Sequence, residues 1–294
     1  MENIAVDYDP NIGYETNSFV KKVFNGFFIP FLNILPSGIR GLVKKTNVSA
    51  KEIIETATSH YAIEILYKHG ESHRSRNLIQ RFFHYVWFST NNPKAVRNRL
   101  RLVKREVSNA IRNHIKNGDD VSILSIASGS ARAIVETLDN PEFLNRKIFV
   151  SFLDKSDKAI NYSKSMTKER DFPENYSFRW IMDEAKSFQN YYEGEIPKPN
   201  IIETVGLMDY FTDEKVLEFF SHIYKNLEPE GVFITANVAD NPERKFVTNL
   251  VGWKMIYREP EKFLRIAVEA GFKDENIKIL FEPLKIHFVM IAKK

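Results

Sequence analysis

Short apolar runs alternate with amphipathic segments from residue 121 to the end of this 294-residue chain. Apolar runs of roughly four to eight residues predict buried strands, and the segments between most of them have helical spacing. Strands joined through helices lie parallel, whereas the tight turn between the last two runs makes that pair antiparallel. We therefore predict an α/β fold with a doubly wound, seven-stranded, mostly parallel sheet. The predicted strands are residues 121–127, 147–153, 176–182, 200–205, 232–238, 276–281 and 285–292.

The N-terminal part has a helical pattern instead, with few strand signals; residues 51–69, for example, carry apolar side chains at helical spacing. Residues 1–117 contain 18 Lys and Arg residues against 9 Asp and Glu residues. The basic residues do not alternate with aromatic ones, so we interpret the excess as a solvated face and expect no nucleic-acid partner. We predict an N-terminal helical or lid region over residues 1–118 and a ligand-binding domain over residues 119–294.

Residues 24–43 form the one stretch with membrane-like composition, but asparagines, two prolines and Arg40 interrupt it. A membrane-spanning helix needs about 20 predominantly apolar residues, so we expect no transmembrane segment. The stretch fits a buried helix pair or a lid, and it also fits the wall of an apolar cavity or a helix that touches a membrane surface. The chain has no cysteine and begins without a secretory signal, so we expect a cytoplasmic protein.

Ligands of open α/β sheets bind beyond the carboxyl ends of the strands, where the strand order reverses. The loop after the first predicted strand is therefore expected to meet the ligand, and its small residues let a ligand approach the backbone. Small residues also occur in such loops for packing alone, so this loop is a weak signal by itself. Its candidate contact residues are Ser125, Ala127, Ser128, Gly129 and Arg132.

Acidic residues follow the next two predicted strands. Asp154 can accept hydrogen bonds from both hydroxyls of a ribose, and Asp183 can meet the amino group of an adenine. Each has an ordinary alternative role, as the N-cap of a helix for Asp154 and in a turn for Asp183. Their occurrence at successive strand ends favours a nucleoside site. Neighbouring candidates at the same strand ends are Lys155, Glu184, Thr204 and Val205.

These residues resemble those of the class I methyltransferases, which use S-adenosylmethionine (SAM). The resemblance covers residues 121–294, and it implies a Rossmann-like fold with SAM as the cofactor. The loop departs from the family pattern, because Ser125 stands where an acidic residue is usual and Ala127 and Ala131 stand where glycines are usual. Gly129 is the position that keeps the family residue.

Three further segments resemble a bacterial subgroup that includes enzymes making 3-hydroxy fatty acid methyl esters. They are residues 95–99 (Ala-Val-Arg-Asn-Arg), 205–211 (Val-Gly-Leu-Met-Asp-Tyr-Phe) and 252–258 (Gly-Trp-Lys-Met-Ile-Tyr-Arg). The resemblance implies methylation of a small molecule. The substrate that it suggests first is the carboxylate of a fatty or 3-hydroxy fatty acid, methylated on oxygen.

We expect the methyl acceptor to meet Asp209, Tyr210, Tyr257 and Arg258. Arg258 can clamp a carboxylate through two hydrogen bonds, and the tyrosine hydroxyls can orient it. A carboxylate is ionised at pH 7 and needs no base, whereas an amine or phenol would need Asp209 or a histidine as the base. The alternatives are helix packing for Tyr257, a surface ion pair for Arg258 and a turn cap for Asp209.

Two other functions are compatible with the same residues. One is methylation of the nitrogen or oxygen of an amine- or phenol-bearing metabolite, and the other is a non-catalytic binding protein that keeps the fold. His69 and His73 have the spacing of two metal ligands on a helix, but Gly70 lies between them and no third ligand is recognisable. We therefore expect no metal. The sequence is compatible with a homodimer.

Overall fold

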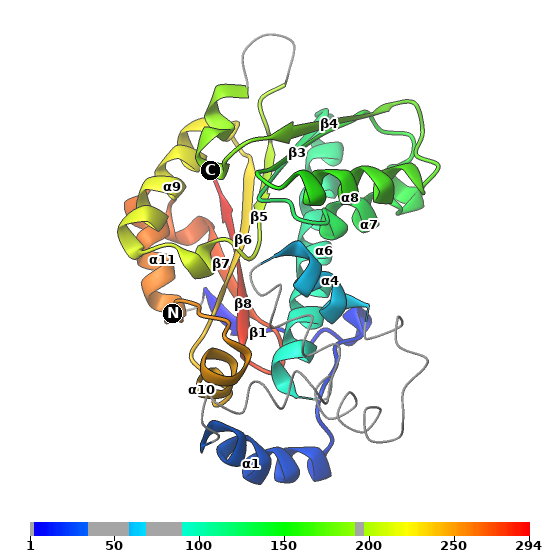
Figure 1. Cartoon of the computed structure of the whole chain (residues 1–294). Helices are drawn as coiled ribbons and strands as arrows, with labels where there is room; N and C mark the ends of the chain where they lie inside the picture. The colour runs from blue at the N-terminus through cyan, green and yellow to red at the C-terminus, as the bar shows by residue number, and fades with distance from the viewer. Residues whose placement is uncertain (1–2, 35–58, 69–89, 192–196) are drawn as a thin grey trace.

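The computed structural model describes residues 3–34, 59–68, 90–191 and 197–294 (Figure 1). The strands of these residues are β1 (Ile4–Val6), β2 (Val121–Ile126), β3 (Ile148–Asp154), β4 (Tyr176–Met182), β5 (Ile201–Thr204), β6 (Val232–Val238), β7 (Ile277–Phe281) and β8 (His287–Lys293). They form one eight-stranded sheet in the order β1-β7-β8-β6-β5-β2-β3-β4. Neighbouring strands are parallel, except that β8 is antiparallel to both β6 and β7.

The sheet confirms the predicted doubly wound α/β fold, and all seven predicted strands are present close to their expected bounds. The eighth strand, β1, is a correction to the predicted number. It pairs in parallel with β7, with Ile4 opposite Ile279. Three residues are too few for an alternating pattern to be visible, so no strand signal could be recognised there.

Helices cover both faces of the sheet (Figure 1). The helices of the described residues are α1 (Phe19–Ile34), α4 (His60–Tyr67), α6 (Asn91–Asn117), α7 (Arg132–Leu138), α8 (Asp157–Lys168), α9 (Asp213–Asn226), α10 (Arg244–Phe246) and α11 (Pro260–Glu269). α9 and α11 pack on one face, whereas α6, α7 and α8 pack on the other. Alternate residues of each strand point to opposite faces, so the same strands contribute to both cores.

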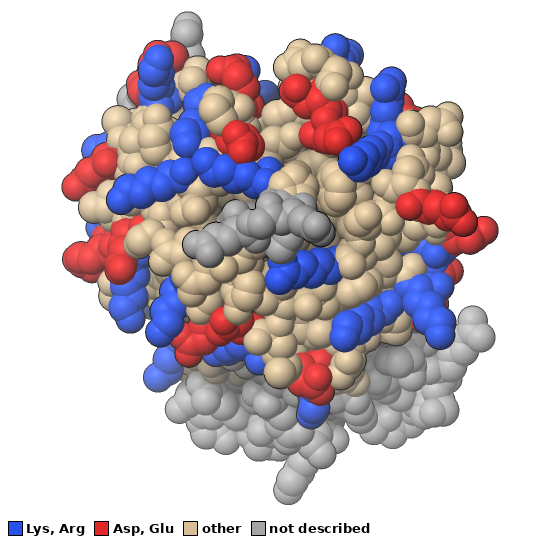
Figure 2. Space-filling model, turned by 90° about the horizontal axis from the view of Figure 1, so that it is seen from above, with Lys and Arg blue, Asp and Glu red and all other residues tan. Residues whose placement is uncertain are grey.

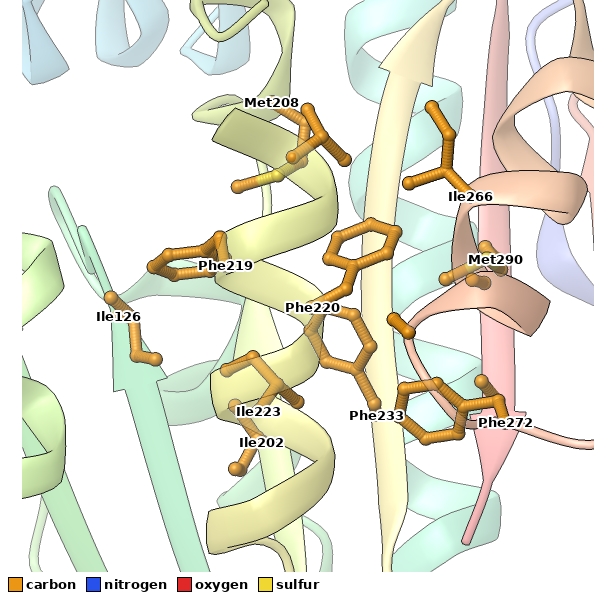
Figure 3. Close-up of a cluster of buried hydrophobic side chains, with 14 of the residues drawn as sticks. Ile126, Ile202, Met208, Phe219, Phe220, Ile223, Phe233, Ile266, Phe272 and Met290 are labelled. Atoms are coloured by element: carbon orange, nitrogen blue, oxygen red, sulfur yellow. The ribbon is translucent and has the colours of Figure 1, made fainter. Parts of the chain in front are cut away.

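The core beneath α9 and α11 is rich in aromatic side chains (Figure 3). Phe220 lies edge-on to Phe233 and to Phe263, with ring centroids 5.1 Å and 5.3 Å apart. Phe233 stacks on Phe272 with a centroid distance of 6.0 Å. Aromatic pairs in these arrangements stabilise a core beyond the area that they bury. These phenylalanines therefore pack in the core, and they are not evidence for an apolar ligand cavity.

The predicted division of the chain near residue 118 stays a prediction. Two elements from before that residue, β1 and α6, join the sheet and its helical layer. α6 ends at Asn117 and is capped by Gly118, whose φ of 84° is a left-handed conformation that glycine adopts without strain.

α1 exposes most of its large apolar residues, although Ile29 is buried. Phe19, Phe27 and Ile34 are 81%, 79% and 80% exposed. Asn25, in contrast, is buried and donates a hydrogen bond to Oδ1 of Asn91 at 3.1 Å. A buried helix is therefore the wrong description for residues 24–34, and residues 35–43 lie outside the described residues. Among the residues that the structure describes, no helix combines the length and the apolar character needed to cross a membrane.

Candidate functional site

A cavity of about 1220 Å³ lies at the carboxyl ends of β2, β3 and β5. The strand order reverses there, because β3 and β4 lie on one side of β2 and β5 and β6 lie on the other. α4 and the first part of α6 contribute further walls. Small-molecule pockets usually measure roughly 300–1000 Å³, so this cavity can hold two small molecules together.

The turn between β2 and α7 contains three left-handed residues. Ala127, Gly129 and Ala131 have φ values of 52°, 54° and 57°. A left-handed conformation costs an alanine about 1–2 kcal/mol relative to its preferred backbone, whereas glycine adopts it freely. The turn therefore keeps a backbone path suited to glycine, although two of its three left-handed positions are alanine. All three residues, together with Ser128 and Arg132, line the cavity.

Asp154, the last residue of β3, contacts this turn. Its Oδ2 accepts the backbone N–H of Gly129 at 2.9 Å, and its Oδ1 accepts the N–H of Ser156 at 2.8 Å. Each oxygen keeps a further lone pair, so the carboxylate can still accept hydroxyl groups from a ligand. The N-cap of α8 is Ser156, which accepts the N–H of Ala159. Asp154 lines the cavity, as does the exposed Lys155.

Asp183, which follows β4, does not line the cavity, but the segment after it does. The Asp183 carboxylate accepts the N–H of Glu184 at 2.7 Å and the hydroxyl of Tyr191. The hydrogen bond from Tyr191 lowers the pKa of Asp183. Glu184 and residues 185–190 line the cavity. Asp183 therefore fixes both ends of a wall segment.

Two of the residues predicted to meet the acceptor, Asp209 and Tyr210, line the cavity. Asp209 is buried, and its Oδ1 accepts the backbone N–H of Val238 at 2.8 Å. Burial raises the pKa of Asp209, and the positive charge of Arg99 opposes that rise. Tyr210 accepts the indole N–H of Trp253 at 2.5 Å. Burial raises the pKa of Tyr210 to about 12, so its hydroxyl keeps its proton at neutral pH.

The other two, Tyr257 and Arg258, do not line the cavity. The guanidinium of Arg258 is buried and fully engaged within the protein. It donates to Oδ1 of Asp213, to the carbonyl of Met208 and to Oδ1 of Asn237, each at 2.8 Å, and to the carbonyl of Phe211. The ring of Tyr257 packs under Arg244, 4.6 Å from ring centroid to guanidinium carbon.

β5 brings an acid to the cavity that the sequence analysis missed. Glu203 lies opposite Ser125 of β2, and the Ser125 hydroxyl donates to Oε2 of Glu203 at 2.5 Å. Burial raises the pKa of Glu203 to about 7. The sheet thus carries a carboxylate beside the position where the resemblance led us to expect one. The available signal was a single acid within an apolar strand. Val205 lines the cavity, whereas Ser125 and the fully buried Thr204 do not.

Arg99 and His287 also line the cavity, and neither was predicted as a site residue. Arg99 comes from α6 and His287 from β8, and both are buried. Nη1 of Arg99 lies 4.0 Å from Oδ2 of Asp209. Burial and the nearby Arg99 lower the pKa of His287 well below its usual range, so its imidazole is neutral at pH 7. The one sequence signal for Arg99 was its place in the segment 95–99.

Glu64 links α4 to the turn after β2. Its carboxylate accepts hydrogen bonds from Nε and Nη2 of Arg132 at 3.0 Å and 2.6 Å, and another from the hydroxyl of Tyr162 at 2.8 Å. Arg132 also donates to Oε1 of Glu136 at 2.5 Å. The guanidinium of Arg132 is therefore held by two carboxylates, and its role at the cavity wall is to connect neighbouring elements.

His69 and His73 lie outside the described residues. In the described part of the chain, no group of three or more His, Cys, Asp or Glu side chains is arranged to hold a metal ion. On the face seen from above in Figure 2, the Lys and Arg side chains that are drawn in colour are interspersed with Asp and Glu.

Comparison with protein families gives one match that spans most of the chain. A family model described as “Putative methyltransferase” matches residues 57–294. A search among curated proteins found no match.

Solved structures share the fold at low sequence identity. A protein from Bordetella parapertussis described as a possible exported protein gives a TM-score of 0.63 at 13% identity, over 81% of this chain and 80% of that chain. The magnesium protoporphyrin IX methyltransferase from Synechocystis PCC 6803 with bound SAH (S-adenosylhomocysteine) gives a TM-score of 0.53 at 9% identity. That alignment covers 84% of this chain and 99% of that chain. Identities this low are evidence for the fold alone.

Proposed function

This chain belongs to the “Putative methyltransferase” family, and from that premise we propose that it transfers a methyl group from SAM to the carboxylate of a fatty or 3-hydroxy fatty acid. When bound, SAM supplies an activated methyl group on a sulfonium. The observation that carries the proposal is the cavity at the ends of β2, β3 and β5, which has room for two ligands.

One end of the cavity fits a nucleoside. We call it the nucleoside end, and it consists of residues 127–132 and Asp154. The left-handed turn keeps side chains small where a ligand would approach the backbone. Asp154 is already oriented by two backbone N–H groups, so its free lone pairs have fixed directions for two ribose hydroxyls. These features fit the adenosine part of SAM.

An apolar wall of the cavity fits an acyl chain. It is formed where α4 and α6 meet the segment after α10, and its side chains belong to one buried cluster. Packing an alkyl chain against such a wall stabilises the complex by about 25 cal/mol per Å² of apolar surface buried. The wall residues are Leu66, Val96, Phe246, Val247, Val251 and Trp253.

The residues around the reacting groups favour a carboxylate as the acceptor. A carboxylate is a nucleophile at neutral pH without loss of a proton, so the protein has to orient it and to exclude water. The neutral hydroxyl of Tyr210 can donate a hydrogen bond to such an anion, because its oxygen already accepts from Trp253. The buried Asp209 supports the loop that carries Tyr210 through the N–H of Val238.

A second candidate function rests on His287. Its Nδ1 is buried without a hydrogen-bond partner among the described residues, and the neutral ring lines the cavity. An imidazole with a lowered pKa is a weak base, so it would accept the proton of a phenol or an amine only as the methyl group is transferred. This acceptor class would use His287 as the general base.

Two measurements test the proposal. Titration calorimetry with SAH tests the cofactor, and we expect binding that 5′-adenosine analogues compete for. Mass spectrometry after incubation with SAM tests the acceptor, offered as a mixture of octanoate, 3-hydroxydecanoate, a primary amine and a phenol. We expect a gain of one CH₂ unit on the acids. No binding of SAH at millimolar concentration would remove the cofactor assignment, and methylation of the amine or phenol alone would favour the second candidate.

A further inference from the structure

Arg99 is a buried arginine with incomplete pairing. Its side chain lines the cavity, and the residue is 4% exposed. The ion pair that it makes, with Oδ2 of Asp209, is long at 4.0 Å. Its Nε has no hydrogen-bond partner among the residues that the structure describes. Buried polar groups normally have such partners, so the free donor of Arg99 is a candidate for binding a ligand.

Arg97, two residues earlier on α6, shows the usual arrangement. Its Nε and Nη2 donate to the two carboxylate oxygens of Glu15 at 2.7 Å and 2.6 Å. A bidentate pair of this kind satisfies a guanidinium with fixed geometry. Arg258 is likewise engaged by groups of the protein. Among these buried arginines, Arg99 is the one that lines the cavity and keeps a free donor.

The acids near Arg99 are each engaged in part by another group of the protein. Oδ1 of Asp209 accepts the N–H of Val238, and Oε2 of Glu203 accepts the hydroxyl of Ser125. His287, which also lines the cavity, carries no charge at pH 7. The guanidinium therefore has donors to offer, and an anionic ligand of planar shape would match them. We call Arg99, Glu203, Asp209 and His287 the charged end of the cavity.

We propose that Arg99 binds a carboxylate group of a ligand at the charged end. The inference rests on the proposed function, because both reactants of that reaction carry a carboxylate. One source is the amino-acid end of SAM, and the other is the fatty acid. The loop after β5 lies against Arg99, since a Cβ added at Gly206 would be 3.9 Å from its Nη2.

Two pairs of ligands distinguish the sources. S-adenosylhomocysteine and 5′-methylthioadenosine share the adenosine and the thioether, but the second lacks the amino-acid end. Octanoate and octan-1-ol share the alkyl chain, but the second lacks the charge. Calorimetry measures all four ligands on the wild-type protein and on Arg99→Gln, with the octyl pair added to SAH-loaded protein.

If the cofactor supplies the carboxylate, Arg99→Gln weakens SAH binding by about 30-fold and leaves 5′-methylthioadenosine unchanged, as loss of a charge-assisted pair requires. If the acceptor supplies it, both adenosine ligands keep their affinities, and octanoate loses about 30-fold while octan-1-ol does not. Unchanged ratios within both pairs overturn the proposal. A wild-type protein that binds neither adenosine ligand defeats the proposed function instead.

The adenosine ligand without a charge also reports on folding. If Arg99→Gln also weakens the binding of 5′-methylthioadenosine, the variant Arg99→Lys is measured in place of Arg99→Gln. The lysine keeps the positive charge beside Asp209 but cannot form a bidentate pair. We then expect Arg99→Lys to lose about 10-fold in affinity for the carboxylate-bearing ligand of one pair, SAH or octanoate, and to keep its affinity for the ligand of that pair without a carboxylate. Equal affinities of Arg99→Lys and the wild type for both charged ligands overturn the proposal. Arg112→Gln, on the outer part of the same helix and paired with Glu142, is the matched control and should change no affinity.

Discussion

At the nucleoside end of the cavity, Asp154 and the turn around Gly129 hold each other through backbone hydrogen bonds, whereas at the charged end Arg99 and His287 are buried with free polar atoms. The first end is fixed in geometry before a ligand arrives. The second end keeps charges in surroundings of low polarity with incomplete pairing, which costs free energy that a ligand of matching charge can offset. We expect the first end to set orientation and the second to set selectivity.

Arg258 does not line the cavity, and its replacement should have the largest effect, which is on stability. Arg258→Ala removes a buried guanidinium that donates four hydrogen bonds within the protein, and we expect it to lower the free energy of unfolding by about 4 kcal/mol. Urea denaturation measures this, with the exposed Arg265→Ala as control. A stable Arg258→Ala protein that has lost methyl transfer would return Arg258 to the role of substrate clamp.

Asp154→Ala removes the acid of the nucleoside end. We expect SAH and 5′-methylthioadenosine to lose affinity equally, by about 100-fold, because the ribose loses two acceptors and the turn loses the partner of its Gly129 N–H. Calorimetry with both ligands measures this, and Asp157→Ala, at an exposed position of α8, serves as the control. An effect confined to SAH would show that the two ends are not separate.

Glu203→Gln tests how much the buried carboxyl of the charged end lowers the free energy of unfolding as the pH rises. The pKa of Glu203 is raised in the folded protein from 4.5 to about 7, so the folded state holds the proton more tightly than the unfolded state does. The carboxyl therefore destabilises the fold increasingly as pH rises from about 4.5 to 7. Relative to Glu203→Gln, the wild type should lose up to about 3 kcal/mol of unfolding free energy over that range.

Urea denaturation at a series of pH values follows this difference. The exposed Glu269→Gln is the control, and its difference from the wild type should not change with pH in this way. A difference between wild type and Glu203→Gln that is constant from pH 4.5 to 8 would show that Glu203 is well compensated inside the protein.

Ala127→Gly should have the smallest effect. It relieves a left-handed alanine, with φ of 52°, and it adds flexibility to the unfolded chain, so the two contributions nearly cancel. We expect a gain of about 0.5 kcal/mol in stability, measured by thermal unfolding. Ala133→Gly, inside α7, is the matched control and should instead lose about 1 kcal/mol. Losses of equal size in both variants would mean that the turn is not strained.

The sequence was sufficient for most of the fold, because each strand from residue 121 onward carries its own local apolar pattern. It also led to most of the loop residues that line the cavity, since the ends of parallel strands meet at one edge of a sheet, although Asp183 lies off the cavity. It was insufficient for Ser125 and Thr204, whose side chains lie off the cavity. A one-residue change along a strand moves a side chain to the opposite face, and the spacing alone does not fix which face meets a ligand.

The charged end was the hardest part to predict. Arg99 comes from α6, the helix that precedes β2, and His287 comes from the last, antiparallel strand. No local pattern connects two residues so far apart, and only the packing of α6 against the sheet brings them to one cavity. Arg258, by contrast, was expected in contact with the acceptor because its segment was considered alone, without the carbonyl groups that surround it.

The three-residue strand β1 has a consequence for the order in which the protein assembles. Ile4 pairs with Ile279, so nearly all of the described chain must be present before this edge of the sheet can be completed. Closing so long a loop is slow, and during synthesis β7 emerges from the ribosome late. Until then, β1 has no strand to pair with. Afterwards it covers an edge of β7 that would otherwise be open to strands of other molecules.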